Sequence, residues 1–334
     1  MKALVTGGGG FLGGAIVKLL LSKGFSVRSL SRGDYPRLAK LGVECLRGDL
    51  NDSAALAAAC GGRDTVFHVA AKVGMWGGYQ DFHETNVDGT AKLLAAAKAA
   101  GVSRFIFTSS PSVVFAGGDV EGWDESAPYP ASFDSYYAET KALAEKLVLA
   151  ANCPQFSTAA IRPHLVWGPG HDHLISGIVS KGRAGNIRRI GEFNKLIDTT
   201  YIDDAARAHW LAAEKLSPGA PCAGKAYFIS QGDPRPNWDI INMILAAAGA
   251  GPAVKRVPYG PAYAAAAAME IFWRLAEIKT EPPLTRFVVQ QLTTAHWFNI
   301  SAARRDLGYA PAVTIEQGMK RLEAWFRSGP PGPW

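Results

Sequence analysis

The sequence has few cysteines and no long uninterrupted apolar run. None of its cysteines forms a CxxC motif or lies beside a histidine at metal-ligand spacing, so we expect neither zinc nor another metal. Their scatter fits reduced thiols in a cytoplasmic protein. The longest apolar-rich stretch, residues 261–278, is interrupted by Glu270, Arg274 and Glu277, so it does not predict a membrane span. The cysteines are Cys45, Cys60, Cys153 and Cys222.

Charge of one sign is not concentrated either. The formal net charge is +6, but there is no dense Lys/Arg block and no basic stripe interleaved with aromatics, so nucleic-acid binding is not expected. A modest positive balance suits an anionic cofactor or an acidic substrate. Met1 leads directly into the strand-like KALVT, so we expect no signal peptide. With 334 residues, the chain can build one large domain or two lobes that share a core.

Glycine, by contrast, is concentrated near the start, in MKALVTGGGGFLGGAIVKLL. Gly7, Gly10 and Gly13 have G-x-x-G-x-x-G spacing between an apolar run and an amphipathic one. Such a turn lets the backbone approach a pyrophosphate and lets the helix pack closely on the strand. The phosphates then lie at the helix N-terminus, where free N–H groups favour negative charge. The alternative is a flexible loop, but the flanking strand and helix favour dinucleotide binding.

Short apolar runs alternate with helical patterns through the first half of the chain. The apolar runs predict strands at residues 2–6, 26–30, 43–50, 65–71, 104–110 and 157–163. The periodic segments predict helices at residues 13–24, 53–60, 86–101 and 136–152. This alternation predicts an α/β fold with a doubly wound parallel sheet of the Rossmann type.

After about Gly168 the alternation loosens, and proline and glycine become more frequent. This change predicts a smaller, mostly helical C-terminal lobe that covers the strand ends and binds substrate. We expect residues 1–167 to form the NADP-binding domain, with residues 196–230 returning to it through a strand at 226–230. Residues 168–195 and 231–330 would form the substrate lobe.

The end of the second predicted strand indicates which dinucleotide is bound. NAD sites usually have an acidic residue there, which accepts a hydrogen bond from the ribose 2′-hydroxyl. Here Ser31 and Arg32 occupy that region, and a guanidinium suits a 2′-phosphate. The sequence therefore favours NADP(H). In the alternative, Arg32 is a solvated loop charge, Asp34 makes the selection, and NAD(H) is the cofactor.

Two later strand ends offer further contacts to the cofactor. Asp49 could accept a hydrogen bond from the adenine amino group, with Leu50 beside the ring, although Asp49 could instead begin a turn. Ala70 and Ala71 are small enough to let the backbone approach the cofactor, or they serve core packing. His68 lies within an apolar strand and is interpreted as a core histidine rather than a catalyst.

A tyrosine and a lysine lie four residues apart in YAETK. Tyr137 and Lys141 therefore share one face of a predicted helix. A nearby ammonium, helped by the oxidised nicotinamide ring, would lower the pKa of the phenol, which is otherwise too high for acid–base catalysis at neutral pH. The lysine can also bind the nicotinamide ribose. Tyr136 points about 100° away around the helix and is the weaker candidate.

A serine cluster precedes that helix, at the end of the fifth predicted strand, in FTSSPSVVF. Ligands meet open α/β sheets at the carboxyl ends of the strands, so the hydroxyl of Ser110 could bond the substrate carbonyl. Ser109 and Ser112 are alternatives. Any of the three could instead serve to turn or cap the chain.

Together, the glycines, Ser110, Tyr137 and Lys141 resemble the short-chain dehydrogenase/reductase superfamily, and IRPHLVWGPG and TYIDDAARAH resemble its extended branch. Within this branch the chain resembles the 3β-hydroxysteroid dehydrogenase group, and in particular the bacterial 2-alkyl-3-oxoalkanoate reductases of long-chain olefin biosynthesis. The matched stretches are SRGDYPRLAKLGVE, AAKVGMWGGY, TSSPSVVF, RPHLVWGPGHDHL, DTTYIDDAARAH, CAGKAYFIS and PLTRFVVQQLTTAHWF.

The resemblance implies roles for individual residues. Ser110, Tyr137 and Lys141 would be catalytic, and Asn86 would hold a water that relays protons to the lysine; without the resemblance, Asn86 would be interpreted as a helix N-cap. The family more often has Asn where Val69 stands, which weakens the assignment of the alanines that follow. The implied cofactor-binding residues are Gly7, Gly10, Phe11, Leu12, Gly13, Ser31, Arg32, Asp49, Leu50, Ala70, Ala71, Lys72, Tyr137, Lys141, Pro163, His164 and Val166.

The implied reaction is the NADPH-dependent reduction of the 3-keto group of a lipid-like 2-alkyl-3-keto acid. Rival hypotheses are a 3β-hydroxysteroid or sterol dehydrogenase and a non-catalytic NADP(H)-binding regulator. Substrate contacts are expected from Trp76, Ser110, Trp167 and Tyr201. The apolar wall of the trough would comprise Met75, Trp76, Tyr79, Trp167, Phe193 and Tyr201, for each of which core packing is the alternative.

The apolar segment 263–273 leaves several roles open. It could form a homodimer interface, cover the substrate tunnel, contact other enzymes of the pathway or touch a membrane surface; alternatively, it is buried within the lobe. We expect a cytoplasmic protein that is peripheral to a membrane if the membrane contact holds.

Overall fold

A parallel seven-stranded sheet forms the centre of the molecule in the computed structural model, which describes residues 1–74, 76–171 and 174–329. Each neighbouring pair of strands is parallel. In sheet order the strands are β12 (Lys225–Ile229), β7 (Ser157–Pro163), β5 (Arg104–Thr108), β4 (Thr65–His68), β1 (Lys2–Thr6), β2 (Ser26–Ser31) and β3 (Glu44–Arg47). The predicted doubly wound Rossmann sheet is confirmed.

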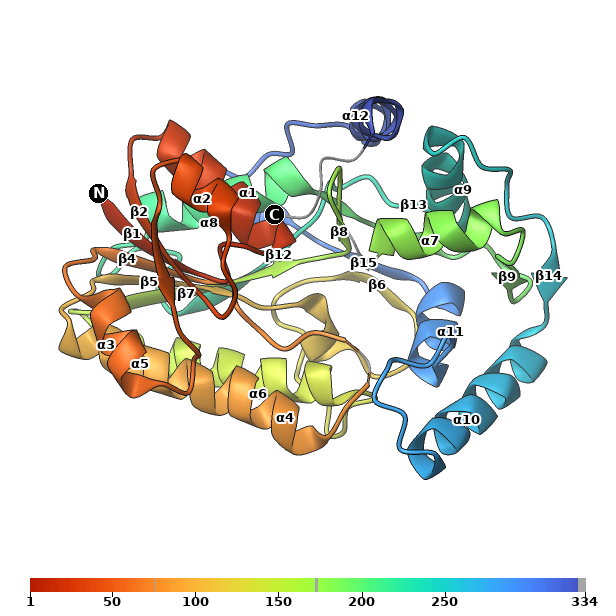
Figure 1. The fold of residues 1–334 in the computed structure, drawn as a ribbon, viewed down its shortest axis with the longest axis horizontal. Helices are drawn as coiled ribbons and strands as arrows, with labels where there is room; N and C mark the ends of the chain where they lie inside the picture. The colour runs from red at the N-terminus through yellow and green to blue at the C-terminus, as the bar shows by residue number, and fades with distance from the viewer. Residues whose placement is uncertain (75, 172–173, 330–334) are drawn as a thin grey trace.

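Helices cover both faces of this sheet (Figure 1). One face carries α1 (Phe11–Ser22), α2 (Pro36–Lys40) and α8 (Ile202–Lys215), and the other carries α3 (Ser53–Cys60), α5 (Gly89–Ala99) and α6 (Tyr136–Ala150). In β1, Ala3 and Val5 join the core beneath α1, whereas Leu4 joins the core on the opposite face. Alternate side chains are buried on opposite faces, as expected for a strand inside a parallel sheet.

The segment after β4 differs from the sequence prediction. The predicted strand at 65–71 ends at His68, because the N–H groups of Val69 and Ala70 both donate to Thr6 Oγ1, at 3.2 Å, rather than to a neighbouring strand. The predicted helix at 86–101 is preceded by α4 (Tyr79–His83) and a π-helical turn, η1 (Glu84–Asp88). π-Helical turns are frequent at functional sites.

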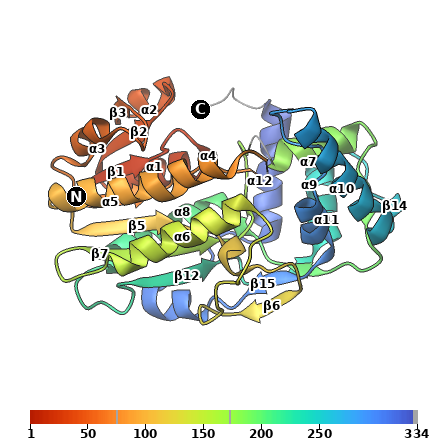
Figure 2. The ribbon, with the colours of Figure 1, turned by 90° about the horizontal axis from the view of Figure 1, so that it is seen from below.

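A second lobe lies at the carboxyl ends of the strands (Figures 1 and 2). Its helices are α7 (Leu174–Arg183), α9 (Asn237–Ala247), α10 (Tyr259–Leu275), α11 (Arg286–Thr293) and α12 (Ile315–Ser328). Its strands form a four-stranded sheet, β13 (Arg235–Pro236), β10 (Leu196–Ile197), β15 (His296–Phe298) and β6 (Val120–Trp123), and the pairs β14 (Arg256–Val257) with β9 (Arg189–Ile190) and β11 (Thr200–Tyr201) with β8 (Val166–Trp167). Because β6 comes from the first half of the chain, the two parts interleave. Two further short helical turns are η2 (Pro111–Val114) and η3 (Ala303–Leu307).

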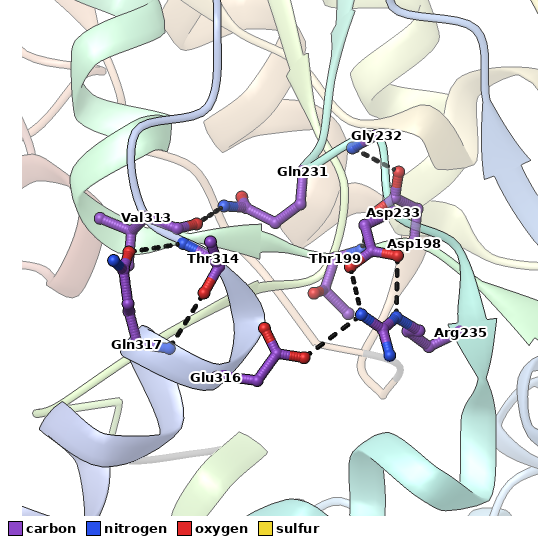
Figure 3. Close-up of polar contacts among 10 residues, drawn as sticks. All are labelled: Asp198, Thr199, Gln231, Gly232, Asp233, Arg235, Val313, Thr314, Glu316 and Gln317. Atoms are coloured by element: carbon purple, nitrogen blue, oxygen red, sulfur yellow. Dashed lines mark hydrogen bonds and ion pairs between the residues drawn. The ribbon is translucent and has the colours of Figure 1, made fainter.

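Polar contacts fasten the start of α12 to the end of the central sheet (Figure 3). Gln231, just after β12, donates through Nε2 to the carbonyl of Val313 at 2.5 Å. Arg235 Nη2 lies 3.2 Å from the Glu316 carboxylate, and Thr314 begins the helix with a capping box. These contacts hold α12 over the junction of the two parts.

The apolar segment around 263–273 lies mostly in α10, which packs on α11 at the rim of the molecule (Figure 1). Ala262 and Ala266 are buried there, but Ile271, Phe272 and Leu275 are 59%, 58% and 81% exposed. Burial within the lobe therefore accounts for only one face of the helix. None of the described helices combines the length and the hydropathy needed to cross a bilayer.

Candidate active site

The glycine turn joins β1 to α1 and leaves bare backbone at the carboxyl edge of the sheet. Gly7 has φ of +70°, a conformation that favours glycine, and its carbonyl accepts a hydrogen bond from the Gly10 N–H at 2.9 Å. A Cβ at Gly13 would collide with the Gly7 carbonyl oxygen. Helix α1 begins with neither a side-chain cap nor an acidic residue in its first turn. Its N-terminus is therefore suited to bind an anion, and the turn fits a dinucleotide diphosphate.

Several other residues expected at the cofactor lie at or just after the ends of β2, β3 and β4. Ser31 ends β2 and Arg32 follows it with its side chain exposed. A Cβ on Gly7 would come within 3.0 Å of the backbone of Ala70, so the ends of β1 and β4 meet closely. Asp49 Oδ1 accepts from the Asn51 N–H at 2.9 Å, which favours the turn alternative for one of its oxygens. Leu50 is buried.

His68 is a core residue, as the sequence indicated. Its Nδ1 lies 2.8 Å from Thr6 Oγ1 and its Nε2 lies 2.9 Å from Thr90 Oγ1. Thr90 donates its own proton to the Asn86 carbonyl at 2.6 Å, so it accepts from a protonated Nε2. Burial lowers the pKa of His68 to about 3, so the ring stays neutral. His68 thus joins β1, through Thr6, to α5, through Thr90.

Ser110 and Tyr137 come together at the start of α6. Ser110 accepts hydrogen bonds from the N–H and the hydroxyl of Ser112, at 3.2 and 3.0 Å, so its own proton is available to the Tyr137 phenol, whose pKa Ser110 acts to lower. Ser109, in contrast, is buried. Tyr136 is 42% exposed, as expected for the weaker candidate. Of the three serines, the geometry favours Ser110, with Ser112 orienting it.

Lys141 lies one helical turn beyond Tyr137 and is buried. Its Nζ donates to the Thr108 carbonyl at 2.5 Å and lies 4.0 Å from the centre of the Phe107 ring. Burial lowers the pKa of Lys141 to about 7, although the Glu145 carboxylate opposes this.

The expected lowering of the Tyr137 pKa is not found in this structure. Burial raises the pKa of Tyr137, and the hydrogen bond from Ser110 opposes that rise. The physical reason is the direction of the lysine, because the ammonium of Lys141 bonds the Thr108 carbonyl. A phenol with a raised pKa is protonated at neutral pH, which is the form that can donate a proton.

Asn86 lies inside the π-helical turn rather than at a helix N-cap. Its Oδ1 accepts from the Lys72 N–H at 2.7 Å, and its Nδ2 donates to the Lys72 carbonyl and to Thr140 Oγ1, each at 3.1 Å. These bonds tie the loop after β4 to α6, between Tyr137 and Lys141. Asn86 thus positions the loop on the cofactor side and the helix that carries the candidate acid.

The stretch after β7 is held firmly. Pro163 ends the strand, and the His164 N–H and carbonyl bond Ile229 and Thr200, at 2.9 and 2.7 Å. The His164 ring points inward, with Nδ1 at 2.5 Å from the Asp198 carbonyl. Val166, in β8, remains half-buried beyond it.

The expected substrate residues separate into two groups. Trp167 and Tyr201 are 1% and 3% exposed, pack edge-to-face at 5.3 Å and lie under Gly318 of α12, which favours core packing over substrate contact. Trp76 donates from its indole to the Ile278 carbonyl at 3.0 Å, so it joins the loop after β4 to the segment that follows α10. Met75 lies outside the described residues.

Phe193 is 73% exposed, and Tyr79 lies on the outer surface of α4, edge-to-face with Tyr136. A cavity of about 380 Å³ opens between Phe193, Tyr259 and Gln290, beside Gly117 of the loop that follows Ser110. Sequence reasoning found Phe193 by its apolar character but could not find this cavity, because its walls come from the segment after β9, the start of α10 and α11.

A doubly wound sheet with this glycine turn, and with a half-buried phenol and a buried ammonium on one helix face, is the architecture of NAD(P)-dependent oxidoreductases that interconvert alcohols and carbonyls. Comparison with protein families agrees: the model of the 3-beta hydroxysteroid dehydrogenase/isomerase family matches residues 4–256. The chain belongs to this family, and the resemblance inferred from its motifs is confirmed.

Similar proteins cover nearly the whole chain. The 2-alkyl-3-oxoalkanoate reductase of Stenotrophomonas maltophilia is 48% identical over 97% of this chain and 99% of that protein. The 3-beta-hydroxysteroid dehydrogenase of Mycolicibacterium neoaurum is 36% identical over 97% and 91%. Among solved structures, a double mutant of dTDP-glucose 4,6-dehydratase from Streptomyces venezuelae with NAD bound is 25% identical, covers 98% of both chains and has a TM-score of 0.77.

Proposed function

We propose that this enzyme reduces the 3-keto group of 2-alkyl-3-oxoalkanoates to the 3-hydroxy acid with NADPH. The observation that supports it best is the placement of Tyr137 and Lys141 on one face of α6, with Lys141 Nζ bonded to the last carbonyl of β5, two residues before Ser110. The likeness to the S. maltophilia reductase over nearly the full length supports the substrate class.

The chain's own residues would work as follows. When bound, NADPH supplies the hydride. Gly7, Gly10 and the first N–H groups of α1 would hold its diphosphate. Ser110 would hydrogen bond the substrate oxygen, and Tyr137 would donate its proton to that oxygen as negative charge develops there. Lys141 would turn from the Thr108 carbonyl to stabilise the phenolate and return its proton.

We assign residues 1–167 and 196–230 to cofactor binding and residues 168–195 and 231–330 to substrate binding. The return of β12 to the edge of the central sheet, beside β7, supports this division. The cavity of about 380 Å³ near Phe193 supports room for an alkyl chain in the second part.

A 3β-hydroxysteroid or sterol dehydrogenase is the second candidate, favoured by the likeness to the mycolicibacterial enzyme. The test runs both reactions in parallel: consumption of NADPH with a 2-alkyl-3-keto acid, and reduction of NAD with a 3β-hydroxysteroid. We expect turnover in the first reaction. Turnover in the second alone would select the rival. Turnover in neither would favour the non-catalytic regulator, against which the intact serine, tyrosine and lysine argue.

Arg32→Asp should move cofactor preference from NADPH toward NADH. The guanidinium lies exposed at the end of β2, where a 2′-phosphate would be held, and a hydrogen bond to a charged group contributes roughly 1.5–3 kcal/mol. We therefore expect the ratio of kcat/KM for NADPH over NADH to fall by at least about tenfold. Lys40→Asp, the same charge change at the end of α2, is the control. An unchanged ratio in Arg32→Asp would assign the selection to Asp34.

The outward face of α10 also supports a proposal about where the enzyme works. Ile271, Phe272 and Leu275 form an exposed apolar edge that suits the surface of a cytoplasmic membrane. Sedimentation with phospholipid vesicles tests this directly. Protein that stays in the supernatant as a stable dimer would assign the face to a homodimer, and a monomeric supernatant would leave the pathway enzymes as its partners.

A further inference from the structure

A buried ion pair lies one helical turn after the candidate catalytic lysine on α6. Tyr137, Lys141 and Glu145 succeed one another at intervals of four along α6, so they share one face. Glu145 is 0% exposed and Arg162, in β7, is 3% exposed. Arg162 Nε donates to Glu145 Oε2 at 2.9 Å, and its Nη2 donates to Oε1 at 2.6 Å, a two-pronged contact.

The surroundings of the pair keep both partners charged. Burial by itself would raise the pKa of Glu145, but the hydrogen bonds and charge of Arg162 outweigh it and hold that pKa below its usual value. Tyr129 also donates to Glu145 Oε1 at 2.6 Å. Burial and the neighbouring carboxylate raise the pKa of Tyr129, so it remains a neutral donor. The Arg162 guanidinium lies 4.9 Å from the centre of the Phe228 ring.

Stability alone does not account for such a pair. Removing two charges from water is costly, and apolar residues of similar volume often serve as well or better. Arg162 is moreover the residue before Pro163, so the pair joins the helix of the candidate catalytic groups to the strand that leads to the predicted nicotinamide site. The placement suggests an electrostatic purpose.

We propose that Glu145 is a positioning residue for the reduction, whose carboxylate, fixed by Arg162, keeps Lys141 charged within the buried site. The inference rests on the proposed function for its kinetic consequence only. Lys141 is buried against the Phe107 ring and a backbone carbonyl, surroundings that favour the neutral amine. A fixed anion one turn away on the same face offsets part of that cost.

Other titratable groups face Lys141 without supplying a charge. His68 approaches from β4 and His209 from α8, and burial lowers their pKa values to about 3 and about 4. His209 Nε2 instead accepts from Thr108 Oγ1 at 2.8 Å. Tyr137, on α6 itself, has a pKa raised by burial and is neutral. Among these neighbours in the described part of the chain, the charged groups are the Glu145 carboxylate and Arg162, its partner on β7.

The sign of the effect follows from the direction of the charge. Burial lowers the pKa of Lys141 to about 7, and the Glu145 carboxylate acts to raise it. Removing that carboxylate should therefore lower the pKa of Lys141 further. Reduction needs the ammonium form of Lys141. In Glu145→Gln, the alkaline decline of kcat/KM should therefore begin at a lower pH than in the wild type. Loss of a neighbouring opposite charge shifts a pKa by about one unit or more, and we expect the alkaline limb to move by about one pH unit.

Two matched variants separate electrostatics from packing. Glu145→Asp retains the charge and should keep the alkaline limb near that of the wild type. Glu145→Gln combined with Arg162→Met leaves no unpaired buried charge, so it should unfold at a higher temperature than Glu145→Gln alone. Its alkaline limb should move in the same direction but by less, because the Arg162 cation is removed as well. A wild-type limb in Glu145→Gln would overturn the proposal.

A second readout does not depend on turnover. The ε-carbon signal of Lys141 can be titrated by NMR in protein labelled with carbon-13 lysine, and assigned by its loss in Lys141→Met. We expect the midpoint to fall in Glu145→Gln and in the double variant, but not in Glu145→Asp. A shifted midpoint without any ketone reduction would refute the proposed function alone, and an unshifted midpoint would refute this inference.

Discussion

Tyr137→Phe should lower kcat for ketone reduction by about a thousandfold, within the range that a positioned general acid contributes. The substitution removes the hydroxyl that Ser110 bonds and keeps the ring, so the packing of α6 should be preserved. A thousandfold change corresponds to about 4 kcal/mol of transition-state stabilisation. The measurement is the initial rate of NADPH consumption at saturating substrate.

The neighbouring tyrosine provides the control for this prediction. Tyr136 lies on the same helix but is 42% exposed, so Tyr136→Phe should retain nearly the full rate. The affinity for NADPH, measured by fluorescence quenching, should be similar in both variants. A Tyr137→Phe enzyme as fast as Tyr136→Phe would remove the phenol from the mechanism.

Gly13→Ala should weaken NADPH binding by about a hundredfold, equivalent to about 2.7 kcal/mol. The new methyl group would collide with the Gly7 carbonyl oxygen and would approach Gly8 Cα to 3.0 Å. Both are backbone atoms of the turn, so relief requires the turn itself to move away from the N-terminus of α1. We also expect a loss of folding stability of about 1–3 kcal/mol, as for other overpacked sites. Calorimetric titration with NADPH and thermal unfolding measure the two effects.

Gly177→Ala is the matched control, because it makes the same change in a helix, where a Cβ meets open space. Alanine is the better helix former by about 1 kcal/mol, so this variant should be at least as stable as the wild type and should bind NADPH normally. Equal NADPH affinity in the two variants would show that the turn tolerates the methyl group and does not need bare backbone.

The parts of the fold and site that local patterns encode could be predicted. The strand, the glycine turn and the helix at the start form one continuous segment, and the spacing of Tyr137 and Lys141 by itself places them on one face. The same spacing, continued by four residues, places Glu145 on that face as well, so its position beside Lys141 was also predictable from the sequence.

The parts that depend on distant segments could not be predicted. Trp167 and Tyr201 are buried because α12 packs over them with Gly318, a contact between widely separated residues that no local pattern reveals. The pairing of β6 with β15 is equally remote, and each strand is too short to show periodicity. The rotamer of Lys141, which bonds the Thr108 carbonyl, depends on packing around the amine and not on its position in the sequence.

The return of β12 to the central sheet means that the first 167 residues cannot fold into a working unit without the later part of the chain. All seven residues of β7 are buried, and β12 is the neighbour that shields its outer edge. A truncated chain ending at Trp167 would carry every proposed acid–base group yet would leave a long hydrophobic strand edge unpaired, which is a template for aggregation. Co-expression of a second fragment carrying the missing strand would be the route to a soluble split enzyme.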